Sequence, residues 1–116
     1  MTIERVHVAK RMSAISIHQG VVRLAGQIAH DPVPDVTAQT TQILGNIDSL
    51  LHAAGSDKHQ ILSAQIFLAS IGDFDAMNLV WDTWVSPSNP PPRATVEAKL
   101  ADPSCRVEIV ITAARI

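Results

Sequence analysis

Two residues in the last quarter of the sequence have the type and setting to do chemistry. Arg93 follows three prolines in the stretch "PPPRATVEAK". Because proline fixes φ and restricts the residue before it, the chain reaches Arg93 with little conformational freedom. A planar guanidinium can grip a carboxylate through two parallel hydrogen bonds. Arg93 is therefore a candidate carboxylate-binding residue, and the alternative is that the prolines only end a loop and leave it in water.

Glu108 is the second such residue, fifteen positions further on in "RVEIVITAA". The alternation of a strand places Glu108 on one face with Val110 and Thr112. A carboxylate among partly apolar neighbours is a candidate for acid–base work on a bound substrate. The alternative is a solvated patch beside Arg106, and the sequence by itself leaves both open.

The remaining reactive side chains do not form a recognisable set. The five histidines are dispersed, no two of them stand four residues apart, and there is one cysteine, so no metal site is predicted. No G-x-S-x-G motif occurs, and the glycines are too scattered to form a phosphate-binding loop. No cofactor is expected. Cys105 is predicted to be a packed thiol, because no histidine or helix N-terminus stands beside it to lower its pKa.

Composition limits the class of protein. The 116 residues are 47% hydrophobic and 17% charged, which suits one globular domain spanning residues 1–116. A net charge of −2, without a cluster of basic and aromatic residues, argues against nucleic acid as a partner. No stretch has the length and apolarity of a signal peptide or a membrane span. We therefore expect a cytoplasmic protein with no membrane association.

The periodicity of apolar residues predicts strands at both ends of the chain and two helices between them. Residues 2–9, 14–20 and 21–29 alternate as strands, the last two forming a hairpin at Gly20. A helix capped by Asp35 runs to Gly55, a strand follows near residues 61–69, and a second helix capped by Asp73 ends before Pro87. Residues 93–101 and 105–114 are predicted to pair as a closing hairpin through "DPS".

The order β-β-β-α-β-α-β-β predicts an α+β fold with one mixed sheet covered on one face by two helices. Each predicted helix has a single apolar stripe, so neither can cover both faces of the sheet. The opposite face then needs another partner, and a symmetric homo-oligomer is the simplest one.

Four motifs in this order resemble the reactive intermediate deaminase family (Rid, or YjgF/RidA, also described as endoribonuclease L-PSP-like). They are "AGQIA", "DFDAMN", "PPPRATVEAKL" and "VEIVITAA", and they extend over nearly the whole chain. The sequence is most similar to a subgroup with an "AMN-x-x-WD-x-WV" helix before a "P-x-R-x-TV" strand. These stretches read "AMNLVWDTWV" and "PPRATV" here.

The resemblance implies a chorismate-mutase-like homotrimer whose sheets pack inward and whose pockets lie between neighbouring subunits. It implies hydrolysis of enamines and imines, such as 2-aminoacrylate, to 2-keto acids and ammonia without a cofactor. At the matching positions, Arg93 would hold the substrate carboxylate and Glu108 would place or activate a water. Gly26, Asn78 and Thr95 would lie at the substrate-binding cleft.

Two positions depart from the best-known deaminases of the family. Those proteins carry a tyrosine near the start of the second strand, where this chain has Met12 and Ser13, and a serine before the Gly-Gln pair, where it has Ala25. A second reading is therefore kept beside the enzyme: a non-catalytic protein that binds a small carboxylate metabolite in the same cleft.

Overall fold

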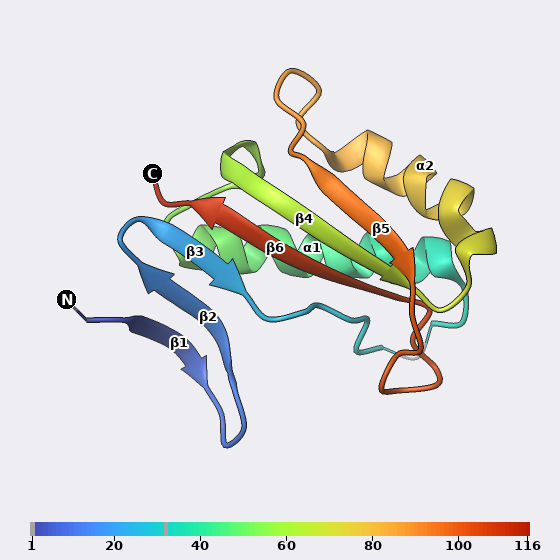
Figure 1. Cartoon of the computed structure of the whole chain (residues 1–116), viewed down its shortest axis with the longest axis horizontal. Helices are drawn as coiled ribbons and strands as arrows, with labels where there is room; N and C mark the ends of the chain where they lie inside the picture. The colour runs from blue at the N-terminus through green and yellow to red at the C-terminus, as the bar shows by residue number, and fades with distance from the viewer. Residues whose placement is uncertain (1, 32) are drawn as a thin grey trace.

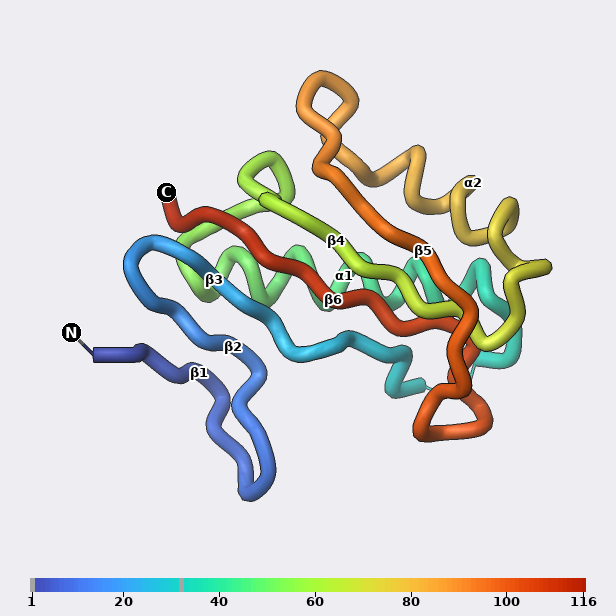
Figure 2. Tube along the Cα trace, viewed as in Figure 1, coloured from blue at the N-terminus to red at the C-terminus, as the bar shows by residue number. Residues whose placement is uncertain are grey.

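The structure is a computed structural model that describes residues 2–31 and 33–116. Six strands form one mixed sheet in the order β1-β2-β3-β6-β4-β5, with β1 and β5 at its edges (Figures 1 and 2). Only β4 and β5 run parallel, and the other neighbours are antiparallel. The strands are β1 (Glu4–Val8), β2 (Ser13–His18), β3 (Val21–Leu24), β4 (Ile61–Leu68), β5 (Arg93–Glu97) and β6 (Val107–Ala114).

Two helices, α1 (Val36–Ala53) and α2 (Phe74–Trp84), share one apolar core with the sheet (Figure 1). Short 3₁₀ turns, Lys58–Gln60 and Ile71–Asp73, precede β4 and α2. The predicted α+β class and the order of strands and helices are confirmed. The core has the aliphatic character that the composition indicated, and Ile43, Ile47, Ile66 and Ile109 are fully buried in it.

The alternation along β6 separates the two faces of the sheet. Val107, Ile109, Ile111 and Ala113 are buried against the helices, whereas Glu108 and the other intervening residues are only partly buried on the opposite face. No helix covers that second face in the described part of the chain (Figure 1). This face is called the open face below.

The two helices begin differently from each other. The Asp35 carboxylate accepts a hydrogen bond of 2.7 Å from the Ala38 amide, so the predicted cap of α1 is confirmed. Gly55 follows α1 with φ at 77°, a left-handed conformation that glycine adopts without strain. Asp73 occupies the N-cap position of α2, but its side chain makes no capping hydrogen bond. Asp73 was correctly predicted as the N-cap residue of α2, but the prediction that its side chain caps the helix was wrong, because the carboxylate pairs with Arg106.

The predicted hairpin at the end of the chain was also wrong. β5 pairs with β4 in parallel, and β6 lies between β3 and β4. The "DPS" turn does form, with the Asp102 carboxylate accepting from the Ser104 amide at 2.9 Å, but it bends a longer crossover. The side chains explain the difference. β6 buries every second residue completely and suits the sheet centre, whereas no β5 residue is fully buried, as expected at an edge.

Within residues 2–31 and 33–116, neither helix combines the length and apolarity that crossing a membrane would require.

Candidate functional site

Arg93 is the first residue of the edge strand β5, and α2 lies beside it. It pairs across the sheet with Ala64, which is buried on the helix-covered face, so its side chain also lies on that face. The Pro92 carbonyl accepts a hydrogen bond of 3.1 Å from the Ala64 amide, which ties the proline run to β4. The prolines thus fix where β5 starts, and with it the origin of the Arg93 side chain.

The guanidinium of Arg93 is held by aromatic rings of α2. Its central carbon lies 5.8 Å from the ring centroid of Phe74 and 5.4 Å from that of Trp81. These are cation–π distances, and Met77 Sδ lies 3.9 Å from one terminal nitrogen. No carboxylate of the described residues forms an ion pair with Arg93. The charge is therefore positioned by stacking, and no acid of the described residues neutralises it.

Two buried side-chain oxygens on the same side of the sheet have no hydrogen-bond partner among the described residues. Thr95 shares the β5 face of Arg93, and Asn78 stands on the α2 stripe that carries Phe74 and Trp81. Among the described residues, Asn78 Oδ1 and Thr95 Oγ1 are buried without a hydrogen-bond partner. A buried polar atom without a partner is costly and usually marks a place where water or a ligand binds. Arg93, Thr95 and Asn78 thus form the α2–β5 half-site.

Glu108 lies with Gly26 on the open face. Its partner in the neighbouring strand β4 is Phe67, and Phe67 in turn pairs with the exposed Val96 of β5. A Cβ atom at residue 26 would overlap the Glu108 carboxylate, so only glycine leaves room for it. Gly26 and Glu108 form a second group, named the β6 half-site.

The five predicted site residues therefore fall into two groups on opposite faces of one sheet. Both residues have a partner in β4. Ala64, the partner of Arg93, is buried under the helices, whereas Phe67, the partner of Glu108, lies on the opposite face of β4. Side chains alternate between the two faces along each strand. This alternation shows whether Arg93 and Glu108 share a face only when the pairing between their strands is known. The predicted hairpin gave the wrong pairing.

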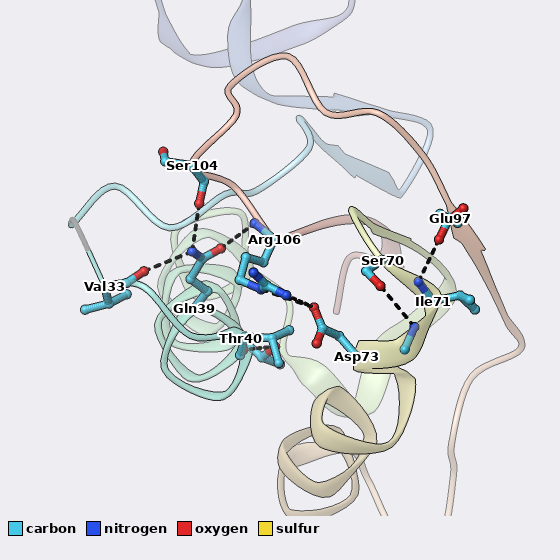
Figure 3. A network of polar contacts seen from close by, with 11 residues as sticks. Val33, Gln39, Thr40, Ser70, Ile71, Asp73, Glu97, Ser104 and Arg106 are labelled. Atoms are coloured by element: carbon cyan, nitrogen blue, oxygen red, sulfur yellow. Dashed lines mark hydrogen bonds and ion pairs between the residues drawn. The ribbon is translucent and has the colours of Figure 1, made fainter.

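A network of polar contacts fixes the start of α2 (Figure 3). Arg106 donates to the Asp73 carboxylate at 2.7 Å, and the Arg106 amide donates to Gln39 Oε1 at 2.8 Å. The Gln39 side chain, nearly fully buried, donates to the carbonyls of Val33 and Ser104. The network connects α1 and the start of β6 to Asp73. Asp73 precedes Phe74, the residue whose ring Arg93 stacks on.

The local sequence pattern does not predict this network. Glu97 adds a contact between β5 and the 3₁₀ turn before α2, because its carboxylate accepts a hydrogen bond from the Ile71 amide at 2.9 Å. The partners of Arg106 are 33 and 67 positions away in the chain, so no local spacing signals them. The signal that could have been used is Gln39, a polar residue on the apolar stripe of a helix.

Cys105 is buried, as predicted for a packed thiol. Burial raises the pKa of this thiol, and the negative charges of Asp102 and Glu108 raise it further. Within the described residues, no group of three histidine, cysteine or acidic side chains is arranged to bind a metal ion.

The fold and motifs match known proteins over essentially the whole chain. The family model Endoribonuclease L-PSP matches residues 2–115. A RutC family protein of Haemophilus influenzae is 50% identical over 119 residues, covering 97% of this chain and 98% of its own. A solved YjgF-family protein from Neisseria meningitidis superimposes with a TM-score of 0.97 at 40% identity, covering 100% of this chain and 97% of its own.

A Yersinia pestis structure described as a conserved Rid family protein of unknown function has a TM-score of 0.86 and 28% identity. It covers 92% of this chain and 90% of its own. The chain therefore belongs to the Rid/YjgF family, and the RutC family proteins are its relatives.

Proposed function

We propose that the protein is a cofactor-independent enamine and imine deaminase acting on small carboxylated substrates of the 2-aminoacrylate type. The observation that carries this proposal is the α2–β5 half-site. There, two rings hold an arginine that has no acidic partner within residues 2–31 and 33–116, beside oxygens of Asn78 and Thr95 that have no hydrogen-bond partner in the same residues. Such a group of donors and acceptors fits a carboxylate and an adjacent imine nitrogen.

The reaction needs few catalytic groups because an imine carbon is already electrophilic. Arg93 binds the carboxylate and fixes the substrate, while Glu108 holds a water. As the water oxygen bonds to the imine carbon, Glu108 takes its proton and passes it to the nitrogen. The hydroxyl group of this addition product then gives its remaining proton to the nitrogen as the carbon–nitrogen bond breaks, which releases ammonia and leaves a 2-keto acid.

This reaction requires a second subunit, because Arg93 and Glu108 lie on opposite faces of their own sheet. In a homotrimer with the open faces packed inward, the α2–β5 half-site of one subunit meets the β6 half-site of the next. The partly buried apolar residues of the open face, Phe67 and Val110, also suit burial in such an assembly.

The expected mass in solution is therefore about three times the 12.5 kDa of the chain. Size-exclusion chromatography with light scattering at micromolar concentration measures it. A monomer at that concentration would contradict both the packing of the open face and the shared site.

Substitution of Gly26 by alanine tests the β6 half-site. The new Cβ would overlap the Glu108 carboxylate, the movable end of a side chain, so the fold should persist while the carboxylate is displaced. We expect turnover of imines to fall at least about tenfold, as for misplacement of a general base. Gly45→Ala is the matched control, because nothing lies within 4 Å of a Cβ at Gly45. Equal turnover in the two variants would remove Gly26 from the site.

The proposed activity is tested by generating an imine with an amino-acid oxidase and trapping it with semicarbazide. Slower trapping in the presence of the protein supports the deaminase. Unchanged trapping together with measurable binding of a 2-keto acid supports the alternative, a non-catalytic carboxylate-binding protein.

The name of the matching family model refers to an endoribonuclease. We do not assign that activity to this chain. Its net charge is −2 and its half-sites contain one cation, Arg93, whereas RNA binding relies on several basic and stacking groups along a groove.

A further inference from the structure

The loop of residues 85–92 connects the two walls of the α2–β5 half-site. It leaves α2 after Trp84 and enters β5 at Arg93 (Figure 1). The prolines at positions 90–92 stiffen its second half. A stiff segment gives Arg93 a defined position only if the loop is also attached to the rest of the molecule. The attachment of this loop is therefore part of how the carboxylate-binding residue is positioned.

His59 attaches the loop at two points. Its Nδ1 atom lies 2.9 Å from the Ser86 hydroxyl, and its backbone carbonyl accepts a hydrogen bond of 3.0 Å from the Asn89 side chain. Ser86 is 1% exposed, and the His59 ring provides the partner that its buried hydroxyl needs. The Ala64 amide holds the far end of the loop by donating to the Pro92 carbonyl at 3.1 Å. The loop is thus fixed at its start, at its middle and directly before β5.

The 3₁₀ turn that contains His59 also supports Arg93 through aromatic rings. Its first residue, Lys58, places its ammonium group 5.7 Å from the ring centroid of Trp84. The rings of Trp84 and Trp81 lie 5.3 Å apart, and Trp81 is one of the two rings against the guanidinium of Arg93. The turn therefore contacts both supports of Arg93, the loop that precedes it and the rings that hold its charge.

We propose that His59 is a positioning residue of the carboxylate-binding site, which keeps Arg93 ready to receive a 2-keto acid or an imine. This inference rests on the proposed function, in which Arg93 binds the substrate carboxylate. The ring of His59 bonds to the loop, so its effect on the guanidinium passes through residues 85–92. An arginine that is already in place binds its ligand more tightly, because less conformational freedom is lost on binding. Glu108 lies on the other face of the sheet, so the chemical step does not depend on His59.

The experiment removes the His59 ring and then restores its hydrogen bond. In His59→Ala the Ser86 hydroxyl loses its partner, so affinity for 2-oxobutyrate in calorimetric titration should fall about tenfold. The amide of His59→Asn can bond the same hydroxyl, so affinity should return to within about threefold of the wild type. His52→Ala is the matched control, because His52 is an exposed histidine of α1 that, among the described residues, forms no side-chain hydrogen bond to the loop.

Two further measurements distinguish positioning of Arg93 from general support of the fold. His59→Ala should raise the KM for an imine by about tenfold and leave kcat within about twofold, because a contact of equal strength in ground and transition states changes only KM. Hydrogen exchange of the Ala64 amide, which is bonded to the Pro92 carbonyl, should become at least about tenfold faster. The Ile109 amide, bonded to the Gln27 carbonyl, should keep its rate.

The outcomes separate this role of His59 from the proposed function. If the wild type binds 2-oxobutyrate and His59→Ala binds it equally well, the positioning role is overturned while the carboxylate site stands. If exchange becomes faster at Ala64 and Ile109 alike, His59 supports the whole fold, which also overturns the role. If the wild type binds no 2-keto acid, the proposed function fails, and exchange at Ala64 decides whether His59 positions the start of β5. Faster exchange that His59→Asn reverses supports this role, and unchanged exchange overturns it.

Discussion

Arg93→Lys is expected to lose the binding of 2-keto acids almost as completely as Arg93→Ala. Lysine keeps the charge, but it lacks the planar pair of donors that meets both carboxylate oxygens. It also lacks the flat surface that stacks between Phe74 and Trp81. Alanine removes both charge-assisted hydrogen bonds, and lysine removes the paired geometry together with the stacking, so affinity should fall by about 100-fold or more in both variants. Calorimetric titration with pyruvate or 2-oxobutyrate measures it.

Arg115 provides the control for this pair of substitutions. It is an exposed arginine whose ion pair with Glu4 is 3.3 Å long, near the opposite edge of the sheet. Arg115→Lys and Arg115→Ala should leave 2-keto acid binding unchanged, because an exposed ion pair contributes little and lies away from both half-sites. Undiminished binding by Arg93→Ala would mean that Arg93 is only a solvated strand end and that the prolines do no more than close a loop.

The sequence was sufficient to predict features that depend on neighbours in the chain. The apolar stripes of α1 and α2, the cap at Asp35 and the glycine after α1 are all encoded within a few residues, and the structure has them. The strands and their order along the chain could be predicted for the same reason. The aliphatic core followed from composition.

Features that depend on distant pairing could not be predicted in this way. The position of β6 between β3 and β4 is decided by the whole sheet, because its fully buried alternate residues are most stable at the centre. The "DPS" turn is compatible both with a hairpin and with the crossover that forms. The separation of Arg93 and Glu108 onto two faces follows from that pairing. The pattern of neighbouring residues could therefore not predict it either.

The same limit explains the role of Asp73. Locally it is a good helix cap, but Arg106 offers it a charge-assisted hydrogen bond at 2.7 Å. The gain is a fixed connection between β6 and α2, which carries Phe74, Met77 and Asn78 to the guanidinium of Arg93. The precise start of α2 is thus set by Arg106, the residue just before β6.

Glu108→Gln is expected to separate binding from turnover. Glutamine preserves the shape of the side chain beside Gly26 and can still hydrogen-bond a water, but its amide cannot take the proton that the water must lose. Affinity for a 2-keto acid should stay within about threefold, whereas imine hydrolysis should fall by about 100-fold or more, the usual contribution of a general base. The imine-trapping assay and calorimetric titration measure the two quantities on the same preparation.

Glu97→Gln is the matched control for this last substitution. Glu97 is exposed at the end of β5, and it accepts a hydrogen bond from the Ile71 amide, which a glutamine oxygen can also accept. Both binding and turnover should therefore survive in Glu97→Gln. If Glu108→Gln also kept full turnover, the carboxylate would not be the proton acceptor. If Glu108→Gln lost affinity and turnover together while remaining a trimer, its carboxylate would serve to bind the substrate, and the water would have to be activated by another group of the shared site.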